Sequence, residues 1–223
     1  RVGVDAYKVA SGDLTWEGLI RRCAKSGKPL ILSTGMCTMS EVKRAVEVIH
    51  GAGNRKLVLL QCTTNYPSPI PDANLRAMMT MRDQLGVAVG YSDHTESDTA
   101  CIAAVALGAC VIEKHFTLDR DLPGPDHKAS VEPAELREMV RAIRNIEQAL
   151  GDGRKRPSEV ERQNRLVARQ SLVAARAIRA GEPFTSENVT TKRPGDGVSP
   201  MRWDAMMGRL ATRNFAADEQ VSD

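Results

Sequence analysis

The chain has 223 residues, of which 42% are hydrophobic, and this share excludes a wholly disordered protein. The 31 basic and 28 acidic residues leave a formal net charge of +3, and aromatic residues make up only 4%, so we expect no nucleic-acid partner. The longest apolar stretch, Ala100 to Ile112, is shorter than the roughly 20 residues of a membrane-spanning helix, so we expect no membrane segment.

The cysteines and the two ends of the chain give further expectations. The chain has 5 cysteines, an odd number, and no two of them form a Cys-x-x-Cys motif. This usage argues against a disulfide framework and a zinc knuckle, and it favours a reducing, cytoplasmic compartment. The chain begins at Arg1 without a signal-peptide pattern and ends at Asp223 without an obvious stop, so we expect a fragment of a longer protein.

Short apolar runs alternate with helical patterns along most of the chain. The predicted strands cover residues 6–10, 29–32, 57–61, 87–90 and 109–113. Each is followed by a predicted helix, at about residues 16–23, 42–49, 74–85, 97–107 and 133–150. In the first helix Trp16 and Cys23 lie on the predicted apolar face, and before the second helix Thr38 and Glu41 form a capping-box sequence.

Five strand–helix units in a row, with strands too apolar to face water, predict an α/β protein with a parallel sheet covered by helices. A doubly wound sheet and a (β/α)8 TIM barrel both fit this pattern, but no glycine-rich nucleotide motif follows any strand, which favours the barrel. A barrel needs eight units, so we expect the first three before Arg1. The predicted domains are the C-terminal part of the barrel at 1–150, a linker at 151–168 and a small, truncated domain at 169–223, with a first strand at 171–175.

Polar and charged side chains follow every predicted strand. A barrel forms its functional site at the carboxyl ends of its strands, so these side chains are expected to converge. The candidates in chain order are Lys8, Ser11, Ser33, Thr34, Thr63, Thr64, Asn65, Tyr66, Ser92, Asp93, His94, Glu113 and His115. His94 and His115 follow neighbouring strands, about 4.8 Å apart, so both imidazoles can reach one divalent ion such as Mn²⁺. The alternative is that each is a hydrogen-bonded loop histidine.

Lys8 lies within an apolar strand, where an unpaired ammonium group is costly to bury. With the hydroxyl groups of the same edge it forms a candidate phosphate site, although a simple salt bridge would also explain it. Asp93 and Glu113 are either partners of a metal or a histidine, or ordinary paired carboxylates. The proline-rich loop around Asp126 either shapes a pocket or merely connects two elements, and Arg193 lies in a turn of the small domain.

Several stretches, taken in order, resemble the sialic acid synthase family, N-acetylneuraminate synthase and its close relatives, over essentially the whole chain. The stretches are Asp5-Ala6-Tyr7-Lys8-Val9-Ala10-Ser11, Ile31-Leu32-Ser33-Thr34-Gly35-Met36, Gln61 to Pro69, Gly90 to Thr95, Glu113 to Thr117, Pro123-Gly124-Pro125-Asp126 and Lys192-Arg193-Pro194-Gly195. The resemblance implies a (β/α)8 barrel followed by an antifreeze-like SAF domain, in a domain-swapped homodimer. It implies an enzyme that condenses phosphoenolpyruvate with an N-acylated aldose, first of all N-acetylmannosamine, to give N-acetylneuraminate and phosphate.

The same resemblance assigns catalytic roles to four residues. His94 and His115 match the ligands of Mn²⁺ or another divalent cation. That ion would act as a Lewis acid on the aldehyde oxygen of the sugar. Lys8 matches a contact to the phosphate of phosphoenolpyruvate, and Glu113 is expected to organise water or the surroundings of the metal.

The resemblance also implies substrate contacts and leaves the acceptor sugar open. Ser11, Ser92 and either Thr64 or Asn65 are expected to contact the phosphate. Tyr66 and Asp126 are expected to contact the sugar. Arg193 is expected to reach the site from the partner subunit of the dimer. A legionaminate or pseudaminate synthase, which uses a 2,4-diacetamido-6-deoxy hexose, is the next alternative. More distant alternatives are another metal-dependent barrel aldolase or hydrolase, and a non-catalytic sugar-binding protein.

Overall fold

The computed structural model describes residues 3–222, so the outermost residues of the predicted domains, Arg1, Val2 and Asp223, lie outside the described residues. The chain divides into two units, Arg1–Gly153 and Arg154–Asp223. Each unit has a hydrophobic core of its own. No helix in the described part of the chain is long and apolar enough to cross a membrane.

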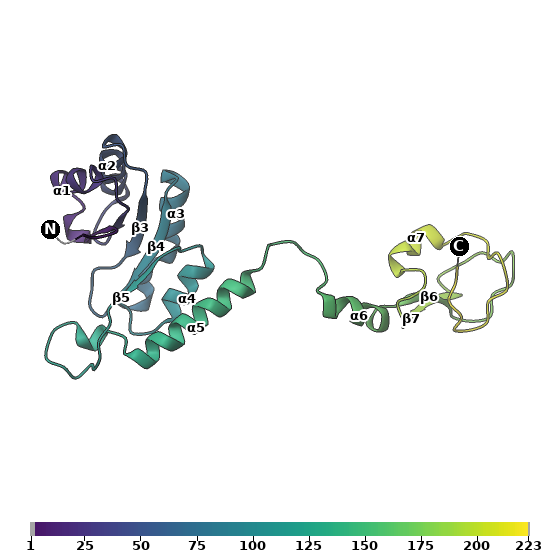
Figure 1. Cartoon of the computed structure of the whole chain (residues 1–223). Helices are drawn as coiled ribbons and strands as arrows, with labels where there is room; N and C mark the ends of the chain where they lie inside the picture. The colour runs from purple at the N-terminus through teal and green to yellow at the C-terminus, as the bar shows by residue number, and fades with distance from the viewer. Residues whose placement is uncertain (1–2, 223) are drawn as a thin grey trace. The chain divides into compact units, whose positions relative to one another are not determined.

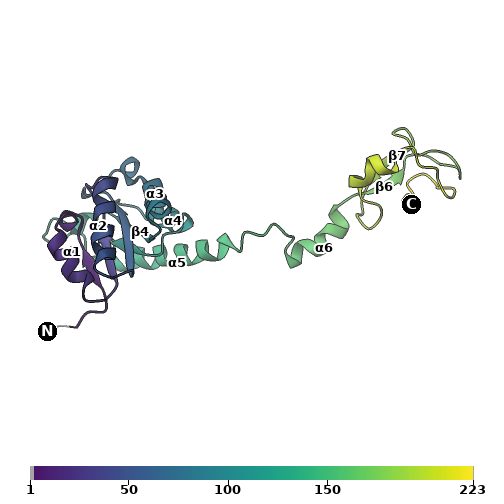
Figure 2. The same ribbon diagram turned by 90° about the horizontal axis from the view of Figure 1, so that it is seen from above.

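The first unit is an α/β half-barrel with a 5-stranded parallel sheet in the order β1-β2-β3-β4-β5 (Figures 1 and 2). The strands are β1 (Tyr7–Val9), β2 (Leu30–Ser33), β3 (Leu57–Cys62), β4 (Ala88–Asp93) and β5 (Ile112–Lys114). The helices that follow them are α1 (Glu17–Ala24), α2 (Met39–Gly51), α3 (Leu75–Leu85), α4 (Thr99–Ala106) and α5 (Pro133–Leu150). The predicted succession of five strand–helix units is therefore confirmed.

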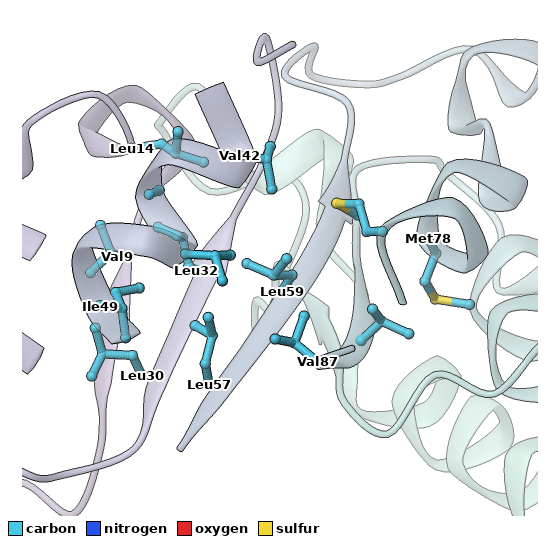
Figure 3. Packing of buried hydrophobic residues seen from close by; sticks show 14 of the residues in the cluster. Val9, Leu14, Leu30, Leu32, Val42, Ile49, Leu57, Leu59, Met78 and Val87 are labelled. Carbon is cyan, nitrogen blue, oxygen red and sulfur yellow. The ribbon is translucent and has the colours of Figure 1, made fainter. Parts of the chain in front are cut away.

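The strands bury alternate side chains against the helices. Leu57 and Leu59 of β3 lie in one hydrophobic cluster with Ile49 of α2 and Met78 of α3 (Figure 3). Tyr91 of β4 belongs to the same cluster. Because successive side chains of a strand point to opposite faces, the residues between these positions face away from the helices, and Ser92 lies among them.

Two predicted strand limits and one predicted burial were wrong. β4 continues through Asp93 instead of ending at Gly90, because the polar ends of β4 and β5 pair with each other. β5 begins at Ile112 instead of residue 109, because the Ala109 amide donates to the Ala104 carbonyl oxygen at 2.9 Å and closes the end of α4. Trp16 was expected on the buried face of α1, but 62% of it is exposed, since it precedes the helix as its N-cap residue.

The predicted linker at residues 151–168 contains a helix, α6 (Glu159–Ala168). A capping box starts it: the Ser158 hydroxyl accepts from the Glu161 amide, and the Glu161 carboxylate accepts from the Ser158 amide at 2.7 Å. This Ser-x-x-Glu sequence is a local signal for a helix start, so the helix was predictable from the sequence.

The second unit contains the two-stranded antiparallel sheet of β6 (Ser171–Ala174) and β7 (Val189–Lys192), and the short helix α7 (Trp203–Met206). The predicted first strand of the small domain is thus present as β6. Its core contains Phe184 and Phe215, whose ring centroids lie 5.9 Å apart. A turn is fixed at Glu182, where hydrogen bonds from the Arg176 side chain, the Arg179 amide and Asn188 lower the pKa of the carboxyl group to about 2.

Gly90 is expected to be essential for the packing of β4. A Cβ atom at this position would lie 2.4 Å from the Val111 carbonyl oxygen and 2.7 Å from a methyl carbon of Leu60. We expect Gly90→Ala to lower the free energy of unfolding by about 1–3 kcal/mol, because the backbone of the neighbouring strand must shift. Urea unfolding of the full-length protein measures this. Gly51→Ala at the end of α2 is the control, since its Cβ meets no atom within 4 Å, and equal stability of both variants would refute the prediction.

Candidate active site at the carboxyl ends of the strands

The parallel strands bring most of the predicted residues to one edge of the first unit. Ser92 of β4 lies opposite Glu113 of β5 in the strand register, and Asp93 lies opposite Lys114. His94 and His115 come directly after these two strands. The site is therefore built on paired backbone, which fixes side chains more firmly than an isolated loop does.

Glu113 links three strands. Its carboxylate oxygen Oε1 accepts a hydrogen bond from the Ser92 hydroxyl at 2.7 Å and lies 3.4 Å from the Lys8 ammonium nitrogen. The Lys8 side chain is nevertheless 35% exposed. The salt bridge considered for Lys8 is thus present, and the ammonium group still remains accessible to an anionic ligand.

The two predicted histidines lie together with Tyr66. The ring centroids of His94 and His115 are 5.2 Å apart, and the Tyr66 ring lies 4.1 Å from His94 and 5.4 Å from His115. His94 Nδ1 is 2.7 Å from the Thr63 carbonyl oxygen. Because a carbonyl oxygen only accepts, Nδ1 carries a proton, and Nε2 is the nitrogen that the neutral form of the ring would offer to a metal ion.

Cys62 is a contact of His94 that was not among the predicted site residues. Its sulfur lies 3.9 Å from His94 Nδ1. Burial favours a higher pKa for the Cys62 thiol, but the hydrogen bond and charge of His94, together with hydrogen bonds from Ser92 and Ser11, outweigh it, so the thiol pKa is lowered. In the same way, burial favours a lower pKa for His94, but Cys62, the Thr63 carbonyl and the charge of Asp93 together outweigh it and raise the pKa of the imidazole. No sequence signal singles out this cysteine among the five.

The two imidazoles fit an open divalent-metal site. Asp126 Oδ2 lies 3.8 Å from His115 Nδ1, so the Asp126 carboxylate lies beside the His115 ring. Within residues 3–222, no group of three or more His, Cys, Asp or Glu side chains is arranged to hold a metal ion. Two protein imidazoles with remaining positions for water or substrate oxygen suit an ion such as Mn²⁺ better than a closed structural zinc site.

A second cluster forms around Gly35, at the end of β2. The Ser11 hydroxyl accepts a hydrogen bond from the Gly35 amide at 2.9 Å. A Cβ atom on Gly35 would lie 2.2 Å from the Thr64 hydroxyl oxygen and 3.0 Å from the Ser11 hydroxyl oxygen. Thr64 therefore faces Ser11, whereas the Asn65 carboxamide oxygen accepts from the Tyr66 amide at 3.2 Å. The sequence pattern does not distinguish Thr64 from Asn65 and does not indicate the close approach of Thr64 and Ser11 to Gly35.

Two other candidates have partners of their own. Asp93 pairs with Lys114 at 2.6 Å, so the paired-carboxylate alternative holds for it. Arg193 belongs to the second unit, where its Nε donates to the Ala168 carbonyl oxygen at 3.0 Å.

Comparison with known proteins adds a family assignment. A model of the NeuB family matches residues 1–155, and a model of the SAF domain matches residues 169–223. The N,N'-diacetyllegionaminic acid synthase of Campylobacter jejuni is 46% identical over 224 residues, which cover 100% of this chain and 67% of the relative. The pseudaminic acid synthase of the same species is 41% identical over 210 residues, which cover 94% of this chain and 61% of the relative.

A solved structure gives the same picture. The chain resembles the N-acetylneuraminic acid (sialic acid) synthetase from Leptospira borgpetersenii serovar Hardjo-bovis, solved in complex with citrate, with a TM-score of 0.68 and 38% identity. The match covers 73% of this chain and 56% of that chain. The chain thus spans about two thirds or less of the length of these relatives.

Proposed function

The chain belongs to the NeuB family, and from this premise we propose that the full-length protein condenses phosphoenolpyruvate with a 2,4-diacetamido-6-deoxy hexose. The products are phosphate and a nine-carbon 2-keto sugar acid of the legionaminate or pseudaminate class. The convergence of the imidazole pair and the Ser11–Gly35–Thr64 cluster on one edge of the sheet supports a phosphate-releasing synthase. The higher identities to legionaminic and pseudaminic acid synthases favour the diacetamido sugar over N-acetylmannosamine, which the sequence analysis placed first.

The phosphate of phosphoenolpyruvate would bind where cation and hydroxyl donors converge. Lys8 supplies the positive charge, and the hydroxyl groups of Ser11 and Thr64 face each other across Gly35. The Ser92 hydroxyl is buried and already donates to Glu113, so its contribution to phosphate binding is indirect. This arrangement neutralises a polyanion mainly by fixed charge and oriented donors.

The carbon–carbon bond would form between C3 of phosphoenolpyruvate and the aldehyde carbon of the sugar. Mn²⁺ bound by His94 and His115 would supply a Lewis acid for the aldehyde oxygen. That oxygen becomes a hydroxyl group after taking up a proton. Tyr66 lies against both imidazoles and Asp126 lies beside His115, so both residues are placed to contact the sugar.

In the remaining step, water adds to C2, the carbon that carries the phosphate group, and phosphate is released. Glu113 is held by Ser92 and Lys8, so its carboxylate has a fixed orientation. We propose that the Glu113 carboxylate accepts the proton that the attacking water loses as the new C–O bond forms. Breakage of the C–O bond to phosphate, with transfer of the C2 hydroxyl proton to the departing phosphate, then leaves the 2-keto acid.

We also propose that the active protein is a domain-swapped homodimer in which Arg193 enters the site of the partner subunit. Arg193 is exposed in the second unit, so its guanidinium group is available for such a contact. Mixed dimers of an Arg193→Ala chain and a His115→Ala chain test this, because each active site of the mixed dimer then draws the two residues from different chains. Turnover regained by mixing two inactive variants supports the swap, and no regain contradicts it.

The proposed function predicts a specific effect of Gly35→Ala. The added Cβ displaces Thr64 and Ser11, so we expect the KM for phosphoenolpyruvate to rise about 10-fold or more, which corresponds to one lost hydrogen bond to a charged group. Steady-state kinetics of the full-length protein measure this. Gly12→Ala is the matched control, because its Cβ meets no atom within 4 Å. A KM equal to that of the control would contradict the role of this cluster.

The proposed function itself is tested by phosphate release from phosphoenolpyruvate in the presence of Mn²⁺. We expect the full-length protein to release phosphate with 2,4-diacetamido-6-deoxy hexoses and much less with N-acetylmannosamine. Preference for N-acetylmannosamine would overturn the proposed sugar and retain the reaction. Absence of release with every acceptor, from folded protein, would overturn the reaction.

A further inference from the structure

The ends of β4 and β5 form three successive side-chain pairs, of which the middle one has no role so far. Ser92 lies opposite Glu113, and Asp93 lies opposite Lys114. The histidines come next on each strand. Strand alternation turns Asp93 and Lys114 toward the helices, on the face where Cys101 of α4 lies 3.2 Å from the Asp93 carboxylate.

The Asp93–Lys114 pair is buried and fully engaged. The ammonium nitrogen lies 2.6 Å from Asp93 Oδ2, and the two side chains are 2% and 0% exposed. Lys114 also donates to the carbonyl oxygens of Thr95 at 2.6 Å and Ser97 at 3.2 Å. The other Asp93 oxygen accepts from the Thr95 amide at 3.0 Å. The pair therefore fixes the chain on both sides of His94.

Stability alone explains such a pair poorly. Burying two charges costs solvation, and replacement of a buried ion pair by apolar residues of similar volume is often neutral or stabilising. What the pair adds is geometry, because it joins β4 to β5 at the last residue before each imidazole. Hydrogen-bonded partners that orient metal-binding histidines commonly have this effect.

We propose that Asp93 and Lys114 are positioning residues that set the spacing and orientation of the His94 and His115 imidazoles. The proposal rests on the proposed function for the role of the imidazoles, but the placement of the two rings is a property of the polypeptide itself. The competing explanation is that the pair only anchors the segment before α4. The two explanations differ in what happens at the imidazoles when the fold is retained.

The experiment uses the full-length protein with the double substitution Asp93→Asn/Lys114→Met, which removes both charges and keeps similar side-chain shapes. Ile49→Ala, in the buried face of α2, is the control for loss of stability without a change next to the imidazoles. Imidazole ¹⁵N and ¹³C NMR signals of His94 and His115 are compared in the metal-free proteins. Mn²⁺ affinity is measured by electron paramagnetic resonance of the free ion.

We expect the double variant to shift the imidazole signals and to bind Mn²⁺ about 10-fold more weakly, whereas Ile49→Ala leaves both unchanged. Unshifted signals in the folded double variant would overturn the proposal. If the wild-type protein does not bind Mn²⁺, the proposed function loses its metal site, but the imidazole signals of the metal-free protein still decide the positioning role. If the double variant does not fold, Asp93→Asn decides by the same signals, because Lys114 keeps its two carbonyl acceptors.

Discussion

His115→Ala is expected to lower the rate of Mn²⁺-dependent phosphate release by the full-length protein about 1000-fold or more. The substitution removes one of two protein ligands, and the Lewis-acid contribution of a metal is worth several kcal/mol, at about 1.4 kcal/mol for each factor of ten. The His115 side chain is 33% exposed, so its removal leaves no closed cavity in the core. The loss of activity should therefore occur without a comparable loss of stability.

The matched control is His50→Ala, which makes the same substitution on α2, away from the strand ends. Phosphate release and Mn²⁺ binding are measured for both variants, with circular dichroism to confirm folding. We expect His50→Ala to retain wild-type rates and Mn²⁺ affinity. Turnover by His115→Ala within about 10-fold of the wild-type rate would refute the metal-ligand role of His115.

The strand-end argument predicted the composition of the site because it depends only on local pattern and chain topology. Parallel strands separated by helices must bring their carboxyl ends together, so His94, His115 and Glu113 meet once the strands are recognised. Side-chain packing does not affect this convergence. The predicted limits of β4 and β5 were wrong by several residues, but the prediction of these site residues was not affected. The order of the strands, and not their length, determines where the residues lie.

The parts of the site that the sequence did not reveal depend on contacts between distant segments. The approach of Ser11 and Thr64 to Gly35 joins three loops, and the contact of Cys62 with His94 joins the last residue of β3 to the residue after β4. A glycine or cysteine at such a position has no local pattern that distinguishes it from others. In contrast, α6 was missed although its capping box is a local signal, because the glycine- and charge-rich residues before it were taken to extend through the whole linker.

The burial of Asp93 and Lys114 shows a further limit of local pattern. In the sequence, Asp93 precedes a histidine and so resembles a partner of that ring. Strand alternation places it on the opposite face, where Lys114 lies 2.6 Å away. Residues that are adjacent along one strand thus point to opposite faces, whereas residues that are opposite each other on two paired strands lie close together.

Lys8→Met is expected to raise the KM for phosphoenolpyruvate about 10- to 100-fold. A hydrogen bond to a charged group contributes about 1.5–3 kcal/mol, which corresponds to a factor of this size in affinity. The effect has a second source, because Glu113 loses its cationic neighbour at 3.4 Å and its carboxylate then faces the phosphate without compensation. The KM for the sugar should change much less, since the imidazole pair and Tyr66 are not altered.

Two further variants separate these sources of the Lys8 effect. Lys43→Met, at an exposed position of α2, controls for the loss of a positive charge elsewhere and should leave both KM values unchanged. Lys8→Met/Glu113→Gln removes the uncompensated carboxylate, so its KM for phosphoenolpyruvate should fall below that of Lys8→Met, although kcat should be low because the proton acceptor is lost. An unchanged KM in Lys8→Met would show that the ammonium group serves Glu113 alone, and the phosphate contact would then have to come from hydroxyl and amide donors.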